Sequence, residues 1–145
     1  MKVFSHVLVA TDFSEASSAA LELAIDMARE CGAKLTLINV CEVPVFVEVG
    51  AQADLVTPIA EASWARLGEL QAAVDARVPG VERLQKIGAP WEEVLEAAAE
   101  IGADLVVVGT HGRRGVSHAL LGSVAERIVR LSPVPVLTVR SGVKT

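Results

Sequence analysis

The sequence predicts an α/β fold built on an open, five-stranded parallel sheet with helices on both faces. Apolar runs of strand length alternate with longer segments of helical periodicity along all 145 residues, and this alternation is typical of parallel sheets. Pro135 falls inside the last apolar run. Because proline cannot donate to a strand ladder, that run is expected at a sheet edge, and the strand order 3-2-1-4-5 places it there.

The first half of this pattern is strand, helix, strand. Residues 3–10 are rich in β-branched and apolar side chains and predict a buried strand. Residues 14–31 predict a helix that ends at Gly32, and residues 33–40 predict the second strand. The apolar positions expected to face the core from this helix are Ala16, Ala20, Leu23, Ala24, Met27 and Cys31.

A long connection follows the second strand. Residues 41–57 carry several valines, punctuated by Pro44 and Gly50, and a connection of this length is either a functional flap or a passive loop. Residues 58–78 predict a helix ended by Pro79-Gly80, and residues 81–87 predict a third strand. The core stripe expected on this helix is Ala60, Leu67, Leu70 and Val74.

The second half repeats the alternation. Pro90 in a first helical turn predicts a helix that ends at Gly102, and residues 103–108 predict a central strand. A further helix over residues 120–131 is stopped by Ser132-Pro133, and residues 134–140 predict the last strand. We expect one domain over residues 1–145.

Composition and charge restrict the class of protein. The chain is 52% hydrophobic, yet it has no apolar run of the roughly 18–20 residues that a membrane span needs. The first ten residues lack the long apolar centre of a signal peptide, so a cytoplasmic protein is expected. A net charge of −5 argues against nucleic acid as a general partner.

Cysteines and histidines show no pattern typical of a metal site. Cys31 and Cys41 form no CxxC motif and are expected to be buried or incidental thiols. His6, His111 and His118 are scattered through the sequence, without the i, i+4 spacing of ligands on one helix. We therefore expect no protein-built metal centre.

The segment from Gly109 to Val124 carries the strongest functional signal. Gly109 and Gly112 follow an apolar run, and Gly122-Ser123 opens an amphipathic helix. Bare backbone N–H groups beside the positive end of a helix dipole suit phosphate oxygens. Arg113-Arg114 in the same loop either binds phosphate or is a solvated loop tip. Ser123 either meets a phosphate or is an ordinary first helical residue.

Asp12 follows the first strand, as Gly109 follows the fourth. Where these strands are neighbours, Asp12 faces the glycine-rich segment across the crevice in which open α/β sheets bind ligands. A carboxylate there can accept hydrogen bonds from ribose or adenine. Asp12-x-x-Glu15 also resembles a capping box for the first helix, and the two roles are compatible.

Other nucleotide and hydrolase motifs are absent from the sequence. It contains no G-x-x-x-x-G-K-[ST], which excludes a Walker-type NTPase. Thr-Asp-Phe-Ser, and not G-x-G-x-x-G, follows the first strand, which argues against a dinucleotide site. No G-x-S-x-G appears either, which argues against an α/β-hydrolase.

The motif Gly109-x2-Gly112-x9-Gly122-Ser123 resembles the nucleotide-binding signature G-x2-G-x9-G-[ST] of universal stress proteins. The similarity extends to residues 7–14, 103–109 and 133–137. Thr11, in place of a more usual proline or tyrosine, and Phe13, in place of glycine, depart from the family pattern.

The resemblance implies a cytoplasmic adenine-nucleotide-binding homodimer linked to stress resistance. It places adenosine at Asp12 and the backbone of Val40, and Mg²⁺ only through the phosphates of ATP. The nucleotide-binding residues expected from the motif and the resemblance are Thr11, Asp12, Val40, Gly109, Thr110, Gly112, Arg113, Gly122, Ser123 and Val124.

Two further functions compete with a regulatory ATP-binding protein. The first is an enzyme that hydrolyses ATP or transfers a phosphoryl or adenylyl group, which needs a base and a carboxylate near the phosphates. Residues 109–124 contain no acid, and His111 is either a base or a solvated loop histidine. The second is an interaction module with an empty site. The sequence does not distinguish ATP from ADP or another adenine nucleotide. We expect binding, through a homodimer paired at residues 134–139.

Overall fold

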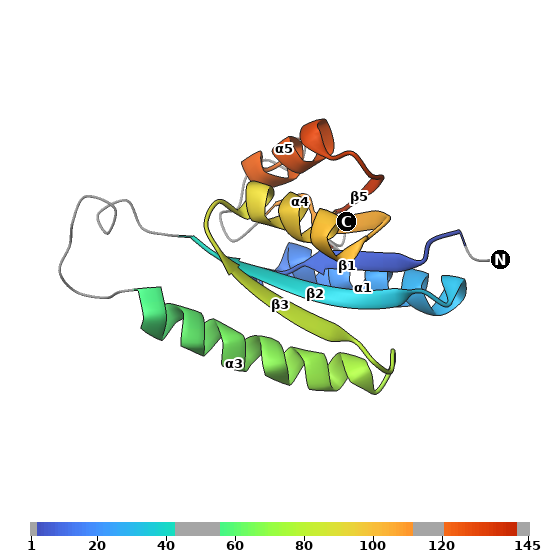
Figure 1. Ribbon diagram of the computed structural model, residues 1–145, viewed down its shortest axis with the longest axis horizontal. Helices are drawn as coiled ribbons and strands as arrows, with labels where there is room; N and C mark the ends of the chain where they lie inside the picture. Colours follow the sequence, from blue (N-terminus) through green and yellow to red (C-terminus); the bar gives the residue numbers. More distant parts are fainter. Residues whose placement is uncertain (1–2, 43–55, 112–120, 142–145) are drawn as a thin grey trace.

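The computed structural model describes residues 3–42, 56–111 and 121–141, and in these ranges strands and helices alternate as expected (Figure 1). The elements in chain order are β1 His6–Ala10, α1 Glu15–Cys31, β2 Lys34–Cys41, α3 Val56–Asp75, β3 Glu82–Ile87, α4 Pro90–Ile101, β4 Leu105–Gly109, α5 Ser123–Leu131 and β5 Val136–Val139.

The sheet has the expected order β3-β2-β1-β4-β5, and every pair of neighbours is parallel. The predicted α/β class and strand order are therefore confirmed. Because β1 leads toward β2 on one side while β4 lies on its other side, the strand order reverses between β1 and β4. In sheets of this kind, ligands bind beyond the carboxyl ends of the strands at that reversal.

The core consists of two layers, one on each face of the sheet. Figure 1 shows α1 and α3 on one face and α4 and α5 on the other. Side chains of β1 alternate between the layers: Val7 and Val9 pack with α1, and Leu8 packs with α4 and α5. Since β1 is buried on both faces, it is an almost continuous apolar run.

Helix α1 differs from its predicted core stripe by about one position. Leu23 and Met27 are only half-buried. The residues that α1 buries are Ala16, Ser17, Ala20, Leu21, Ala24, Ile25 and Ala28. Alanines at 16, 20, 24 and 28 let α1 pack close to the sheet, and the larger Leu21 and Ile25 are buried as well.

Several element boundaries are corrected at the C-terminal end of the chain. Helix α5 begins at Ser123, three residues later than predicted, because Gly122 is extended (φ −67°, ψ 163°) and donates its N–H to the Thr110 carbonyl at 2.6 Å. The last strand is four residues long and not seven. Pro135 precedes this strand and contributes a carbonyl, which accepts from the Val106 N–H at 3.0 Å.

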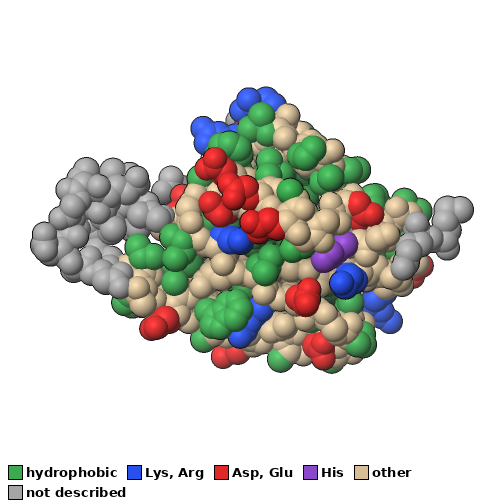
Figure 2. All heavy atoms as spheres, viewed as in Figure 1, with side chains coloured by type: hydrophobic (Ala, Val, Ile, Leu, Met, Phe, Trp, Pro, Cys, Tyr) green, Lys and Arg blue, Asp and Glu red, His purple; other side chains and the backbone are tan. Residues whose placement is uncertain are grey.

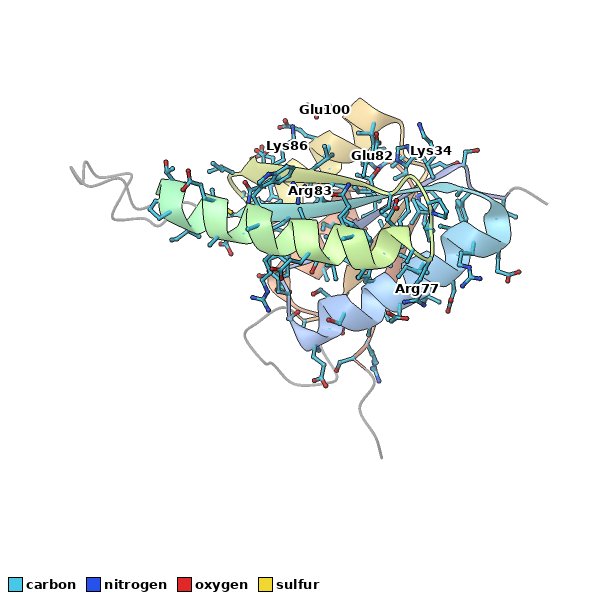
Figure 3. All side chains as sticks on the ribbon, turned by 90° about the horizontal axis from the view of Figure 1, so that it is seen from below. Lys34, Arg77, Glu82, Arg83, Lys86 and Glu100 are labelled. Atoms are coloured by element: carbon cyan, nitrogen blue, oxygen red, sulfur yellow. The ribbon has the colours of Figure 1, made fainter. Side chains whose placement is uncertain are left out.

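The two edges of the sheet differ in chemistry. Edge strand β3 carries charged side chains: Arg83 lies between β3 and α3, and Lys86 meets Glu100 of α4 at 3.1 Å (Figure 3). Charge on an edge discourages pairing with another chain. The other edge, β5, is half-buried Val136-Leu137-Thr138-Val139 and has no charged side chain.

Acidic side chains gather over α4 on the face shown in Figure 2. They come from the helix sequence itself, which carries Glu92, Glu93, Glu96 and Glu100. This face would repel the phosphate backbone of a nucleic acid. Among the described residues, no helix combines the length and apolarity that crossing a membrane requires.

Candidate functional site

The carboxyl ends of β1, β2 and β4 meet the first turn of α5 in one cleft of about 650 Å³. This volume lies within the roughly 300–1,000 Å³ of small-molecule sites. The residues expected in the site that line the cleft are Thr11, Asp12, Val40, Gly109, Thr110, Gly122, Ser123 and Val124. Gly112 and Arg113, also expected there, lie outside the described residues.

Backbone groups of β2 and β4 point into the space beyond the end of β1. The Ile38 carbonyl accepts from the Thr11 N–H, and the Cys41 carbonyl accepts from Gly88 on the opposite side. By alternation along the strand, the peptide groups of Val40 face the β1 side, past the last β1–β2 pair, Ala10↔Ile38. A donor and an acceptor there suit the edge of a planar base.

The turn after β1 is held by buried and half-buried polar side chains. The Asn39 amide donates to the Thr11 carbonyl at 2.9 Å, and the Asp12 carboxylate accepts from the Ser14 N–H at 3.0 Å. The helix cap is Ser14, whose hydroxyl accepts from the Ser17 N–H at 3.3 Å. Asp12 therefore orders the turn and is not the cap itself, which corrects the capping-box interpretation.

Phe13 has a left-handed backbone, with φ 65°. A bulky residue adopts this conformation at a cost that glycine does not incur. Two contacts hold it there: its N–H donates to the Thr11 hydroxyl at 3.0 Å, and the Arg66 guanidinium lies 4.4 Å from the ring centre. The conformation explains why glycine is the usual residue in the family pattern from which Phe13 departs.

Thr11 itself is a structural member of this turn. Its side chain is buried, and its hydroxyl lies 3.2 Å from that of Ser17 in addition to accepting from Phe13. Thr11 borders the cleft, but its hydroxyl is engaged within the protein.

The first turn of α5 presents backbone donors to the cleft. Its cap residue, Gly122, has no side chain with which to bond them, so the N–H groups of the first turn have no intrahelical partner. The backbone angles of Gly122 suit any residue. Glycine at this position is therefore not needed by the backbone, and it leaves the space above the helix terminus open.

Gly109 has a different reason to be glycine. A Cβ atom built on it would lie 2.8 Å from the backbone carbon and oxygen of Ala16 in α1. Its lack of a side chain is thus required by helix packing, and this requirement holds with or without a ligand. Gly109 does extend two residues beyond the last β1–β4 pair, Val9↔Val107, at the cleft.

The sequence left two roles open for His111, a catalytic base or a solvated loop histidine, and its environment does not fit a fully solvated side chain. Its residue is half-buried, its Nδ1 lies 3.3 Å from the Thr110 hydroxyl, and its Nε2 is buried without a hydrogen-bond partner among the described residues. Within the same residues, no group of three His, Cys, Asp or Glu side chains could hold a metal ion. Both cysteines are free thiols.

Several residues of the cleft were missed by sequence reasoning. Glu42 lies just past β2, and Ile59 and Ser63 reach the cleft from the first turns of α3. Their sequence positions lie on either side of the long connection, and only folding brings them to Asp12. Asn39 had a usable signal, because an amide in an otherwise apolar strand requires a partner.

The sequence matches the universal stress protein family over residues 4–140. It is 32% identical to universal stress protein MJ0531 of Methanocaldococcus jannaschii, over 95% of this chain and 83% of that one. The fold is similar to UspA of Lactobacillus plantarum, with a TM-score of 0.80, 24% identity and coverage of 94% and 97%. It is also similar to a universal stress protein solved in complex with cAMP, with a TM-score of 0.71, 30% identity and coverage of 96% and 98%. The chain therefore belongs to the universal stress protein family.

Proposed function

We propose that this protein binds ATP in the cleft between β1, β2, β4 and α5 and acts as a cytoplasmic regulator of a stress response. On this proposal residues 1–145 form one nucleotide-binding domain, and the protein is not an efficient enzyme. The observation that carries the proposal is the first turn of α5, whose cap residue Gly122 has no side chain to bond it, lining the same cleft as Asp12 and Val40.

The proposed binding mode follows the chemistry of the two ends of the cleft. The Asp12 carboxylate and the peptide groups of Val40 recognise adenosine, because both lie at the carboxyl end of β1 and β2. The phosphates lie at the α5 terminus, where backbone N–H groups and the helix dipole favour negative charge. The phosphate-binding residues in this proposal are Gly109, Thr110, Gly112, Arg113, Gly122, Ser123 and Val124.

Adenine-nucleotide chemistry is supported by one relative at 30% identity, which was solved with cAMP. ATP is our choice because the proposed phosphate-binding residues come from two separate segments, one that follows β4 and one that opens α5. Mg²⁺ accompanies the phosphates, since residues 109–124 contain no acid that could hold it. The same lack of an acid disfavours activation of water, so ATP turnover is expected to be far below the roughly 1–10³ per second of ordinary enzymes.

A physical route links the cleft to the β5 edge. Thr110 accepts from Gly122 at 2.6 Å and donates its N–H to the Val139 carbonyl at 2.9 Å. We propose that β5 pairs with its copy in a homodimer, so that nucleotide occupancy at Gly122 reaches the dimer contact through Thr110.

A thermal melt with and without nucleotide tests the binding proposal. At a hundredfold excess over Kd, a ligand stabilises the native state by about 2.7 kcal/mol, which for a chain of this length raises Tm by roughly 5–10 °C. AMP, with one phosphate, should raise Tm less than ATP. Asp12→Ala should weaken ATP while leaving any binding of inorganic triphosphate unchanged.

Gly122 provides the matched variants. Gly122→Val should abolish the ATP shift by filling the phosphate position, while Gly122→Ala should reduce it less. Val129→Ala, on the exposed side of α5, should keep the full shift. If millimolar ATP does not raise the Tm of the wild type, and Gly122→Val behaves identically, the nucleotide-binding proposal is wrong and the protein is an interaction module with an empty site.

A further inference from the structure

A second chamber of about 510 Å³ adjoins the nucleotide cleft on the other side of the α5 terminus. It is lined by the turn into α4 (Gly88–Trp91), by the first turns of α5 with Arg127, and by Glu42. The two spaces are adjacent, since Glu42, Pro90, Ser123 and Val124 border both. Figure 1 shows the starts of α4 and α5 together at the end of the molecule toward which β2 runs.

The chemistry of this chamber differs from that of the phosphate position. Trp91, Pro90 and Val124 form an apolar wall, and the Arg127 guanidinium lies 5.9 Å from the centre of the Trp91 ring. The guanidinium lies over this partly buried ring, and nucleobases stack both on aromatic rings and on guanidinium planes. The Glu42 carboxylate on the shared border would repel a further phosphate group but can accept from a sugar hydroxyl or a base amino group.

The position of the chamber determines which part of the nucleotide a group bound there would be bonded to. In the proposed binding mode the phosphates lie at Ser123 and Val124, and these residues also line the second chamber. A group bonded to the far end of the phosphate chain therefore enters the chamber, while adenosine stays at Asp12. Each space alone has the size of a small-molecule site.

We propose that the site takes a dinucleoside polyphosphate: adenosine in the cleft, the phosphate chain across the α5 terminus, and the second nucleoside against Trp91 and Arg127. This inference rests on the proposed nucleotide binding and extends it to a ligand class. A mononucleotide fills only the first half of the site.

The test compares two ligands with the same phosphate chain. Diadenosine tetraphosphate carries the second nucleoside, and adenosine tetraphosphate lacks it. By calorimetry, the former should bind at least about fivefold more tightly, since base–aromatic stacking contributes roughly 1–3 kcal/mol. Trp91→Ala should reduce this advantage and leave the affinity for adenosine tetraphosphate unchanged. Arg127→Ala also removes a positive charge near the phosphate chain, so it should weaken diadenosine tetraphosphate more than adenosine tetraphosphate.

Tryptophan fluorescence supplies a readout that does not require removing Trp91. The chain has two tryptophans. Trp64 lines neither the cleft nor the second chamber, and the Arg83 guanidinium lies 3.7 Å from the centre of its ring. In a Trp64→Phe background, diadenosine tetraphosphate should quench Trp91 emission, and adenosine tetraphosphate should leave it nearly unchanged.

The outcomes separate the two proposals. Equal affinity for both ligands with unchanged Trp91 emission would overturn the second nucleoside position and leave ATP binding standing. Failure of ATP and adenosine tetraphosphate to bind at all would overturn the nucleotide site itself, and the second nucleoside position with it.

Discussion

At the scale of single residues, two positions of one motif are glycine for different physical reasons. Gly109 is required because α1 lies against it, with Ala16 backbone atoms 2.8 Å from where a Cβ would stand. Gly122 has backbone angles that any residue can adopt. A glycine-spacing motif therefore combines a requirement of the fold with a requirement of the proposed ligand.

This difference predicts opposite effects of substitution. Gly109→Ala should lower the free energy of unfolding by roughly 1–3 kcal/mol, because backbone of α1 must move to admit a methyl group. Gly122→Ala should change it by less than about 1 kcal/mol. Urea denaturation of both variants without nucleotide measures the difference, and equal losses would show that the packing argument is wrong.

At the scale of elements, the start of β1 is hydrogen-bonded to β2 on one side and to the turn between α4 and β4 on the other. Nε2 of His6 shares a hydrogen bond of 2.8 Å with the hydroxyl of Thr36 in β2. The Asp104 carboxylate, just before β4, accepts from the N–H groups of Ser5 and His6 at 2.9–3.1 Å. These backbone donors lower the pKa of Asp104. Burial of the His6 ring, followed by the charge of Lys34, lowers the pKa of His6 below its ordinary 6.5.

The lowered pKa of His6 predicts how stability depends on pH. The unfolded chain binds a proton at His6 more readily than the folded protein, so acid favours unfolding. The contribution of neutral His6 should be complete above pH 6.5 and should be lost as pH falls through the lower folded pKa, with a slope of at most about 1.4 kcal/mol per pH unit. Urea midpoints between pH 7.5 and 5 measure this slope.

His6→Gln is the control, because an amide keeps a polar partner for Thr36 and does not titrate in this range. Its slope should be flatter than that of wild type. Asp104 does not interfere, since its lowered pKa places its own loss of stability below pH 3.8. An unchanged slope in His6→Gln would assign the pH dependence to other groups.

At the scale of the whole molecule, the two sheet edges predict which one forms a dimer. β3 carries charge, whereas β5 presents Val136–Val139 with no charged side chain. The carbonyls of Pro135 and Val139 accept from Val106 of β4 and from Thr110 just after it, so by alternation the N–H of Thr138 points outward from the sheet. Thr138→Pro removes that outward donor and keeps the bonds to β4.

Wild type should have the mass of a dimer by light scattering, and Thr138→Pro should shift it toward the monomer. Thr138→Val keeps the N–H and should remain dimeric. A dimer that persists in Thr138→Pro with unchanged dissociation would exclude pairing through β5.

Much of the architecture was determined by sequence alone. Apolar runs and helix stops at Gly32 and Gly102 predicted the element order, and Pro135 predicted that the last strand lies at an edge, because these signals act over short stretches of chain. The rule that ligands bind at strand ends predicted that Asp12 and Gly109 share one cleft, and the family resemblance added Val40; all three line it. Helix and strand ends were less accurate, since the start of α5 depends on a bond between Gly122 and Thr110.

Only the tertiary structure decided the parts of the site that come from contacts between distant segments. The left-handed Phe13 is held by Arg66 of α3, and Gly109 is constrained by Ala16 of α1. Trp91 and Arg127 lie 36 residues apart in sequence and meet only where α4 and α5 begin together. Periodicity reports which face of an element is buried, but close approach, positive φ and shared cavities depend on how elements pack, and packing is a property of the whole fold.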